Sequence, residues 1–313
     1  MTQHPPAPDR TDGPRPKILL IGANGQVGWE LRRTLAGLGE VVAASIESGY
    51  GPIIDLLDHG LLAQLVADTQ PDAVVNAAAY TAVDKAETDR DIARRINADA
   101  VGELGRLLAE RGIPIIHYST DFVFSGAADR PYTEDDAVGP LNVYGETKLG
   151  GELALLDSGA PCLIFRTSWV YGARGANFLL TMLRLLKEKD ELRIVDDQIG
   201  SPTWSRMLAE MTGLVLYRVL RGDVDLKQVG GLYHLTGSGE VSWFGFAQAI
   251  LERAGLECRL LPIHSNDYPA PARRPAYSVL DNHKFQETFG LYLPHWRESL
   301  DQCLELIPCG SCQ

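Results

Sequence analysis

Short runs of apolar residues alternate along the chain with longer segments whose apolar positions recur every three or four residues. Four of the short runs, at residues 17–21, 73–76, 113–117 and 162–165, are apolar at most positions. A strand of this kind has no polar face, which favours a parallel sheet buried under helices on both sides. We therefore predict buried strands at these four places.

Two of the intervening segments carry an apolar stripe at helical spacing, as crossover helices do. The stripes are formed by Val27, Leu31 and Leu35, and by Val101, Leu104, Gly105, Leu107, Leu108 and Ala109. Repeated strand–helix–strand units predict an α/β fold with a Rossmann-type, doubly wound parallel sheet. Its ligand crevice is expected at the carboxyl ends of the strands.

The alternation loosens after residue 170, which predicts a smaller C-terminal substrate-binding lobe. A helix is expected over 178–189 and another after Ser242, with loops rich in glycine and proline around them. Residues 231–235 look like a strand returning to the first sheet. We expect residues 17–170, with a returning segment near 229–240, to form the dinucleotide-binding domain, and residues 171–228 and 241–313 to form mainly the lobe.

Composition and charge narrow the classes of protein that fit. The chain has 313 residues, 45% of them hydrophobic and 22% charged, which indicates a globular protein with one main domain. Its net charge of −12 disfavours nucleic-acid and anionic-membrane binding. Residues 1–16 contain five prolines and no apolar core of a secretory signal, so a disordered tail is expected there.

The cysteines point to a reducing compartment. Five cysteines, an odd number without a secretion signal, favour free thiols and a cytoplasmic location over a disulfide framework. Cys309 and Cys312 form a lone CxxC near the end of the chain. Without a second ligand pair, a frayed tail is favoured there over a metal or redox site.

The first motif with chemical content is a glycine-rich turn. Gly22, Gly25 and Gly28 lie between the first predicted strand and the first predicted helix. Glycines there let the backbone approach a pyrophosphate, whose charge is held by free amides at the helix N-terminus. The position of the turn therefore predicts a dinucleotide site, although a purely structural turn has the same pattern.

The second motif pairs Tyr144 with Lys148, and Thr120 ends a predicted strand upstream. Residues i and i+4 share one face of a helix, so the ammonium is expected near the phenol. A phenol titrates near pH 10, and a nearby cation lowers that pKa. Tyr144 could then protonate the alkoxide formed when a ketone accepts hydride, while Thr120 hydrogen-bonds the same oxygen.

Several longer stretches resemble the dTDP-4-dehydrorhamnose reductase family of extended short-chain dehydrogenase/reductases. They are GQVGWE (25–30), VNAAAYTAVDKAE (75–87), HYSTDFVF (117–124), PLNVYGETK (140–148), FRTSWVY (165–171), DQIGSPT (197–203) and GLYH (231–234). The resemblance covers almost everything after the tail. It implies NAD(P)H-dependent reduction of the 4-keto group of dTDP-4-dehydro-L-rhamnose to dTDP-L-rhamnose, a precursor of cell-wall polysaccharide and O-antigen.

The resemblance also implies roles for particular residues. The catalytic set is Thr120, Tyr144 and Lys148. The cofactor-binding positions are Gly22, Gly25, Gln26, Val27, Gly28, Ser45, Asp55, Leu56, Ala79, Tyr80, Thr81, Tyr118, Tyr144 and Lys148. The sugar-nucleotide positions are Thr120, Asp121, Asn142, Trp169, Asn177 and Arg274. Two of these have alternative interpretations, because Trp169 could be core filler and Arg274 a solvated surface charge.

Two departures from the family pattern affect the expected cofactors. Ser45 stands where relatives often carry an acidic residue, so NADPH is expected and NADH remains possible. Some relatives hold magnesium between subunits with three glutamates. Here Glu30 keeps one of those positions, but Arg206 and Arg297 occupy the others. Magnesium is therefore not expected, and the protein is predicted to be a monomer or a weak homodimer.

Three alternative functions share this fold. A nucleotide-sugar 4-epimerase uses the same tyrosine and lysine. A 4,6-dehydratase needs a second carboxylate after the threonine, whereas this chain has Phe122 after Asp121. A regulatory subunit of the kind that binds methionine adenosyltransferase would need no catalytic set, and a retained motif does not prove turnover.

Overall fold

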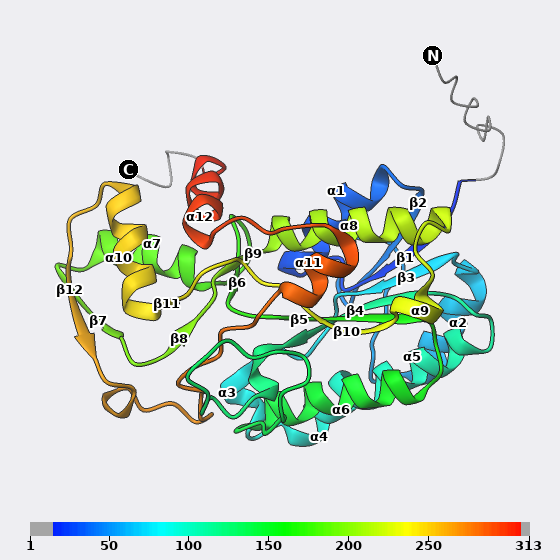
Figure 1. The fold of residues 1–313 in the computed structure, drawn as a ribbon, viewed down its shortest axis with the longest axis horizontal. Helices are drawn as coiled ribbons and strands as arrows, with labels where there is room; N and C mark the ends of the chain where they lie inside the picture. The colour runs from blue at the N-terminus through cyan, green and yellow to red at the C-terminus, as the bar shows by residue number, and fades with distance from the viewer. Residues whose placement is uncertain (1–14, 308–313) are drawn as a thin grey trace, which may run out of the picture.

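The computed structural model describes residues 15–307, so the expectations for residues 1–14 and for Cys309 and Cys312 lie outside the described residues. Its centre is a six-stranded sheet in the order β10-β5-β4-β3-β1-β2, in which every neighbouring pair is parallel (Figure 1). The strands are β1 (Lys17–Ile21), β2 (Glu40–Ala44), β3 (Ala73–Asn76), β4 (Ile115–Thr120), β5 (Cys162–Thr167) and β10 (Gly231–His234). The predicted Rossmann-type parallel sheet is therefore confirmed.

Two of the predicted strands have different bounds from those expected. β4 begins at Ile115 and continues to Thr120, and β5 continues to Thr167. Both extensions add polar residues, which an apolar pattern cannot detect, yet all six residues of each strand are buried. As a result Thr120 is the last residue of β4 and lies at the carboxyl edge of the sheet.

Helices cover both faces of the sheet. Figure 1 shows α1 (Gln26–Ala36), α8 (Ser205–Arg221) and α11 (His283–Phe289) on one face, with α2 (His59–Thr69), α5 (Ala100–Ala109) and α6 (Val143–Asp157) on the other. The predicted stripe residues Leu31 and Leu35 of α1 pack in the first layer, and Leu104 and Leu108 of α5 pack in the second. Two buried layers therefore enclose the sheet, as the uniformly apolar strands predict.

The helix before α5 is irregular. α3 (Val83–Ala86) and α4 (Arg90–Arg94) are followed by a π-helical turn at Arg95–Asp99 that runs into α5. Single π turns often occur at functional sites because they redirect a side chain. Here the turn carries Asn97, whose side chain hydrogen-bonds the backbone of Tyr80 in the loop after β3.

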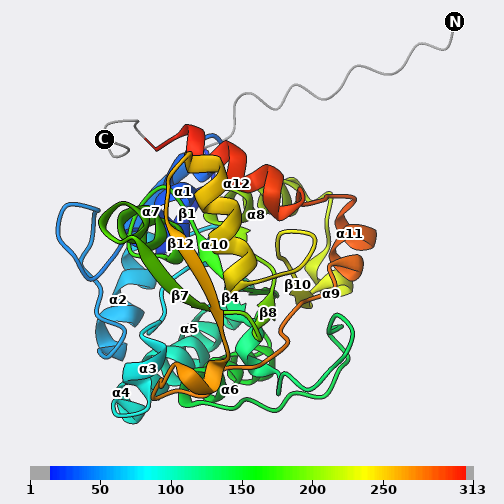
Figure 2. The ribbon, with the colours of Figure 1, turned by 90° about the vertical axis from the view of Figure 1, so that its left-hand side faces the viewer.

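The rest of the chain builds a second core at one end of the sheet (Figure 2). It contains α7 (Phe178–Glu188), α10 (Trp243–Ala254), α12 (Trp296–Glu305) and the parallel pair β7 (Glu191–Val195) and β12 (Arg259–Ile263). Four short strands lie between this core and the sheet and form two pairs, β6 (Val170–Tyr171) with β9 (Thr203–Trp204) and β8 (Ile199–Gly200) with β11 (Val241–Ser242). A short helix, α9 (Leu226–Val229), leads from α8 into β10.

The later helices and the returning strand lie where the sequence predicts them. α7 ends one residue before the predicted end, and Ser242 caps the helix that follows it by accepting a hydrogen bond from Gly245 N. β10 returns to the sheet beside β5. Within residues 15–307 no helix combines the length and apolarity needed to cross a bilayer.

Candidate active site

The glycine-rich turn connects β1 to α1 in a conformation that only glycines allow. Gly22 has φ +87°, and a Cβ on it would lie 2.5 Å from Ala78 N. A Cβ on Gly28 would lie 2.0 Å from Gly22 O. The N-cap residue, Gly25, has no side chain to bond the first amides of α1. The turn thus leaves a backbone cradle at a helix N-terminus, which fits the pyrophosphate of a dinucleotide.

A second cofactor segment follows β3 and is fixed by Asn97. The Asn97 side chain accepts a hydrogen bond from Tyr80 N (2.8 Å) and donates one to Tyr80 O (3.1 Å). It also donates to the Thr147 hydroxyl (3.1 Å), which lies on α6 next to Lys148. This buried amide therefore holds the predicted ribose-binding loop, Ala79 to Thr81, against the helix that carries Tyr144.

The predicted adenine-side residues surround the end of β2. Ser45 is buried, and its hydroxyl donates to Glu47 O (2.8 Å), so it is already used inside its own loop. Asp55 accepts a hydrogen bond from Leu57 N (2.9 Å), and Leu56 packs in the core. No carboxylate stands at residue 45 to repel a 2′-phosphate, whereas the neighbouring Glu47 is exposed.

The three predicted catalytic residues meet at the carboxyl edge of the sheet. Tyr144 and Lys148 lie one turn apart on α6, and Thr120 ends β4 close enough to the Tyr144 phenol to influence its pKa. The Thr120 hydroxyl also donates to Asp121 Oδ1 (3.0 Å). Asn142 caps α6 by accepting from Gly145 N (2.8 Å), and so fixes the start of the helix that presents Tyr144.

Lys148 does not point where the sequence suggests. Its Nζ donates to Tyr118 O (2.6 Å) and lies 3.2 Å from His117 Nε2. The pKa of Tyr144 is raised to about 12, because burial and the charge of Asp121 outweigh the hydrogen bond with Thr120. The expected lowering of the phenol pKa by Lys148 is therefore wrong for this structure.

Burial also shifts the pKa values of the neighbouring charged groups. The pKa of Lys148 is lowered to about 8 by burial, against an opposing effect of the Glu152 carboxylate. The pKa of Asp121 is raised to about 7 by burial, although the neighbouring Ser278 and Thr120 side chains and nearby backbone amides favour the charged form. Both groups thus titrate much closer to neutrality than they do in water.

A buried ion pair lies one turn below Lys148 on α6. Glu152 accepts two hydrogen bonds from Arg166 of β5, at 2.9 Å and 2.7 Å, and the two side chains are only 2% and 4% exposed. Sequence reasoning missed Glu152, Arg166, His117 and Asn97. Glu152 could have been found, because it continues the i, i+4 row of Tyr144 and Lys148.

The predicted sugar-nucleotide residues divide into two groups. Asp121 follows β4 directly and Trp169 is the second residue after β5, so both lie at the same edge as Thr120. Asp121 Oδ2 is buried without a hydrogen-bond partner. Asn177 instead caps α7 and donates to the Gln26 side chain (2.9 Å), next to the glycine-rich turn. Arg274 forms an ion pair with Asp84 (2.9 Å), and both side chains are partly exposed.

Of the three positions considered for magnesium, two hold arginines that make other contacts. Arg206 forms an ion pair with Glu30 (3.1 Å), and Arg297 lies 4.6 Å from the ring centroid of Trp296. In the described part of the chain, no cluster of three or more histidine, cysteine, aspartate or glutamate side chains is arranged to hold a metal ion.

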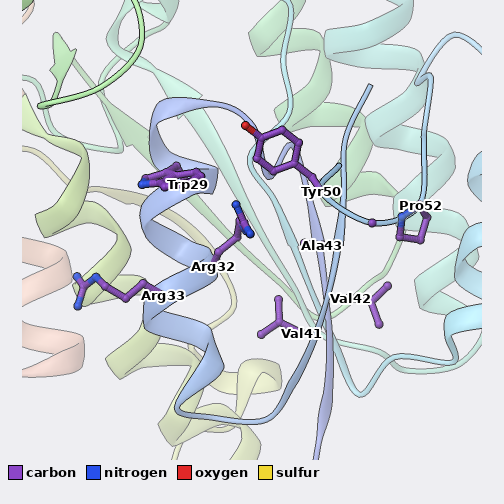
Figure 3. A pocket seen from close by; sticks show the side chains of 9 residues that line it. Trp29, Arg32, Arg33, Val41, Val42, Ala43, Tyr50 and Pro52 are labelled. Carbon is purple, nitrogen blue, oxygen red and sulfur yellow. The ribbon is translucent and has the colours of Figure 1, made fainter. Parts of the chain in front are cut away.

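A surface pocket between α1 and the edge strand β2 contains none of the predicted catalytic residues. Figure 3 shows the Arg32 side chain extending toward Trp29 and Tyr50, and its guanidinium lies 4.9 Å and 5.1 Å from their ring centroids. Arg174 lies 3.6 Å from the Trp29 ring centroid. Because the two arginine side chains stack on these aromatic rings, we interpret the pocket as surface packing beside α1.

Comparisons with known proteins cover nearly the whole chain. A family model described as the RmlD substrate binding domain matches residues 16–308. The dTDP-4-dehydrorhamnose reductase of Burkholderia thailandensis is 48% identical over 296 residues, which are 92% of this chain and 98% of that protein.

Two solved dTDP-4-dehydrorhamnose reductases share the fold. The structure from Clostridium acetobutylicum has a TM-score of 0.84 and 37% identity, and the match covers 93% of this chain and 99% of the other. The structure from Bacillus anthracis, determined in complex with NADP, has the same TM-score, 32% identity and the same coverage. The candidate active site therefore lies within the part of the chain that matches these relatives.

Proposed function

The chain belongs to the dTDP-4-dehydrorhamnose reductase family, and we propose that it reduces dTDP-4-dehydro-L-rhamnose to dTDP-L-rhamnose with NADPH. The observation that carries the proposal is the meeting of three groups at one edge of the sheet. The proposal is supported by their positions in the fold: Tyr144 and Lys148 lie one turn apart on α6, Thr120 ends β4, and the glycine-rich turn follows β1 of the same parallel sheet. That is the geometry a ketone reductase needs, because hydride and proton must reach neighbouring atoms of one carbonyl.

The cofactor would be held by residues that the fold already orders. Gly22 and Gly28 allow close approach to the pyrophosphate, and Asn97 fixes the Tyr80 loop. Bound NADPH supplies the hydride for the carbonyl carbon. Lys148, a buried cation on α6, would hold the nicotinamide ribose.

Tyr144 supplies the proton in the proposed reaction. Its pKa of about 12 keeps the phenol protonated at neutral pH, which is the form that a proton donor needs before reduction. As negative charge develops on the carbonyl oxygen, the phenol donates its proton to that oxygen. Thr120 would hydrogen-bond the same oxygen by turning its hydroxyl proton from Asp121 Oδ1 toward it.

Asp121 is proposed to hold a hydroxyl group of the sugar. Its buried Oδ2 has no partner, and buried polar atoms are nearly always hydrogen-bonded in native proteins. A sugar hydroxyl would donate a hydrogen bond to that oxygen.

The proposed reaction requires no magnesium ion. Of the three positions that hold magnesium in some relatives, only Glu30 is acidic here, and it is already paired with Arg206.

The dehydratase alternative is disfavoured by the residue after Asp121. Phe122 stands where a second carboxylate would be needed, and its ring packs edge-on against Tyr144 at 5.8 Å. Elimination of water would have no second acid-base group at this position.

The direct test is to incubate the purified chain with dTDP-4-dehydro-L-rhamnose and follow the absorbance of NADPH, with NADH and with EDTA in parallel. We expect consumption of NADPH with formation of dTDP-L-rhamnose, at least as efficient as with NADH and unaffected by EDTA. A folded protein that consumes neither cofactor, and instead co-purifies with a methionine adenosyltransferase, would support the regulatory-subunit alternative.

A further inference from the structure

The indole of Trp169 is stacked face to face on a second tryptophan. Trp169 lies just beyond β5 at the carboxyl edge of the central sheet, and Trp243 is the first residue of α10 in the second core. Their ring centroids are 3.5 Å apart and their planes differ by 4°. One face of the Trp169 indole is therefore fully covered by Trp243.

The other face of the same indole lies against Gly200. A Cβ on Gly200 would lie 2.4, 2.6 and 2.8 Å from the indole atoms Cε2, Nε1 and Cζ2. Nearly equal distances to three adjacent ring atoms place that Cβ over a ring face. Because Trp243 fills the space over one face, Gly200 must lie over the opposite one.

The two residues that enclose Trp169 are placed by one small sheet. β8 pairs with β11, so that Gly200 lies opposite Val241 and Trp243 follows two residues later. The Trp169 loop is tied to the segment after β8: the Ser168 hydroxyl donates to Ser201 O (2.7 Å), and Thr203 N donates to Trp169 O (3.2 Å).

Trp169 itself has φ +45°, a left-handed conformation that bulky residues rarely adopt. Such a conformation persists only where the surroundings fix it, and it occurs often at ligand sites. The enclosure by Gly200 and Trp243 provides that fixation. With both faces covered, only the edge of the indole remains for a ligand, and the N–H in that edge can donate a hydrogen bond but not accept one.

We propose that Gly200 and Trp243 are positioning residues that hold Trp169 edge-on to the sugar nucleotide, so that its indole N–H donates to an oxygen atom of that ligand. The inference rests on the proposed function, because it takes a sugar nucleotide as the ligand. It makes Trp169 a hydrogen-bond donor rather than a platform on which a sugar ring stacks. Loss of the enclosure should therefore weaken sugar-nucleotide binding, while the proton transfer at Tyr144 continues.

The test combines kinetics, binding and circular dichroism. Stacked indoles whose transition dipoles are rotated relative to each other give a coupled far-ultraviolet signal, which reports the Trp169–Trp243 stack independently of activity. Trp243→Leu should abolish that signal and raise both KM for the keto sugar and Kd for dTDP-L-rhamnose by about 2- to 12-fold, the range that aromatic pairs are worth. The kcat value and the Kd for NADPH should stay within about twofold of the wild-type values.

Three further variants separate positioning from general packing. Trp243→Phe should lose the coupled signal yet keep KM near the wild-type value, because a flat ring still covers the indole. Gly200→Ala should raise KM at least as much as Trp243→Leu, since its methyl group would overlap the Trp169 ring. Trp29→Phe, a control on α1 outside the stack, should keep both the signal and KM.

Unchanged KM and unchanged dTDP-L-rhamnose affinity in folded Trp243→Leu and Gly200→Ala proteins would show that the stack is packing alone, and would overturn the inference. If the wild-type protein showed no turnover, the proposed function would fail. The affinity for dTDP-L-rhamnose and the circular dichroism signal would still decide the role of Gly200 and Trp243.

Discussion

The Lys148 ammonium donates a 2.6 Å hydrogen bond to the backbone carbonyl oxygen of Tyr118, two residues before the end of β4. This bond joins α6 to β4 at the level of the proposed catalytic residues. The ammonium also lies 3.2 Å from His117, whose pKa is lowered well below its usual value by burial, so Lys148 contacts two neutral groups rather than a carboxylate. Burial then lowers its pKa to about 8, and its charge remains available to a ligand in the crevice.

Replacing Lys148 by methionine should reduce both the affinity for NADPH and the rate of reduction. The ammonium is proposed to hold the nicotinamide ribose, and a methionine offers no hydrogen-bond donor there. We expect at least about a tenfold rise in the Kd for NADPH, since hydrogen bonds to charged groups are worth about 1.5–3 kcal/mol. Fluorescence titration with NADPH measures this. The exposed Lys187→Met is the control, and an unchanged Kd in Lys148→Met would remove the cofactor role.

The stability of the protein should fall as pH rises through the titration of Asp121. Burial raises the pKa of this carboxyl from 3.8 to about 7, so the folded state keeps a proton that the unfolded chain releases. The contribution of Asp121 to the free energy of unfolding is therefore greatest below about pH 4. It is lost as the pH rises from about 4 to 7, by roughly 1.4 kcal/mol for each pH unit.

Asp121→Asn tests this pH dependence, because an amide resembles the protonated carboxyl and does not titrate. The free energy of unfolding of each protein is measured in urea from pH 4.5 to 8. That of the wild-type protein should decrease with pH as Asp121 loses its proton, and that of Asp121→Asn should lack this decrease. Parallel curves for the two proteins over this range would show that Asp121 does not titrate with a raised pKa.

Breaking the buried Glu152–Arg166 pair should destabilise the fold strongly. In Glu152→Gln the Arg166 guanidinium loses its counter-charge inside the protein, which typically costs about 3–5 kcal/mol. Urea unfolding measures the loss. The matched control is Glu103→Gln in the surface pair of Glu103 and Arg106, where about 0–1 kcal/mol is expected.

The double variant Glu152→Leu/Arg166→Met provides a further check on the pair. Because it removes both charges, it should be less destabilised than Glu152→Gln. If Glu152→Gln were as stable as the surface control, the charge of Arg166 would have to be compensated elsewhere.

Local patterns were sufficient to predict the elements that carry the site. Consecutive apolar residues identify the central strands, and the i, i+4 spacing of Tyr144 and Lys148 puts both on one face of α6. The glycine-rich turn is predictable because Gly22 and Gly28 meet steric requirements that lie within a few residues of chain. These features depend on neighbours close in sequence, which is why sequence alone reveals them.

The partners of the site residues could not be predicted in this way. Arg166 reaches Glu152 from another strand, and Trp243 reaches Trp169 from the second core, so only the folded chain brings them together. Asn97 depends on a π-helical turn that leaves no periodic signal. The direction of Lys148 was also missed, because the buried carbonyl of Tyr118 competes for its ammonium.

The central claim is that Tyr144 donates the proton, and Tyr144→Phe tests it most directly. Phenylalanine keeps the ring that packs against Phe122 and removes only the phenol oxygen. The account predicts a loss of about 100- to 10,000-fold in kcat for the reduction of dTDP-4-dehydro-L-rhamnose, with the Kd for NADPH nearly unchanged. The exposed Tyr217→Phe should retain full activity as the control. A folded Tyr144→Phe protein with near-normal kcat would contradict the account and would mean that another group supplies the proton.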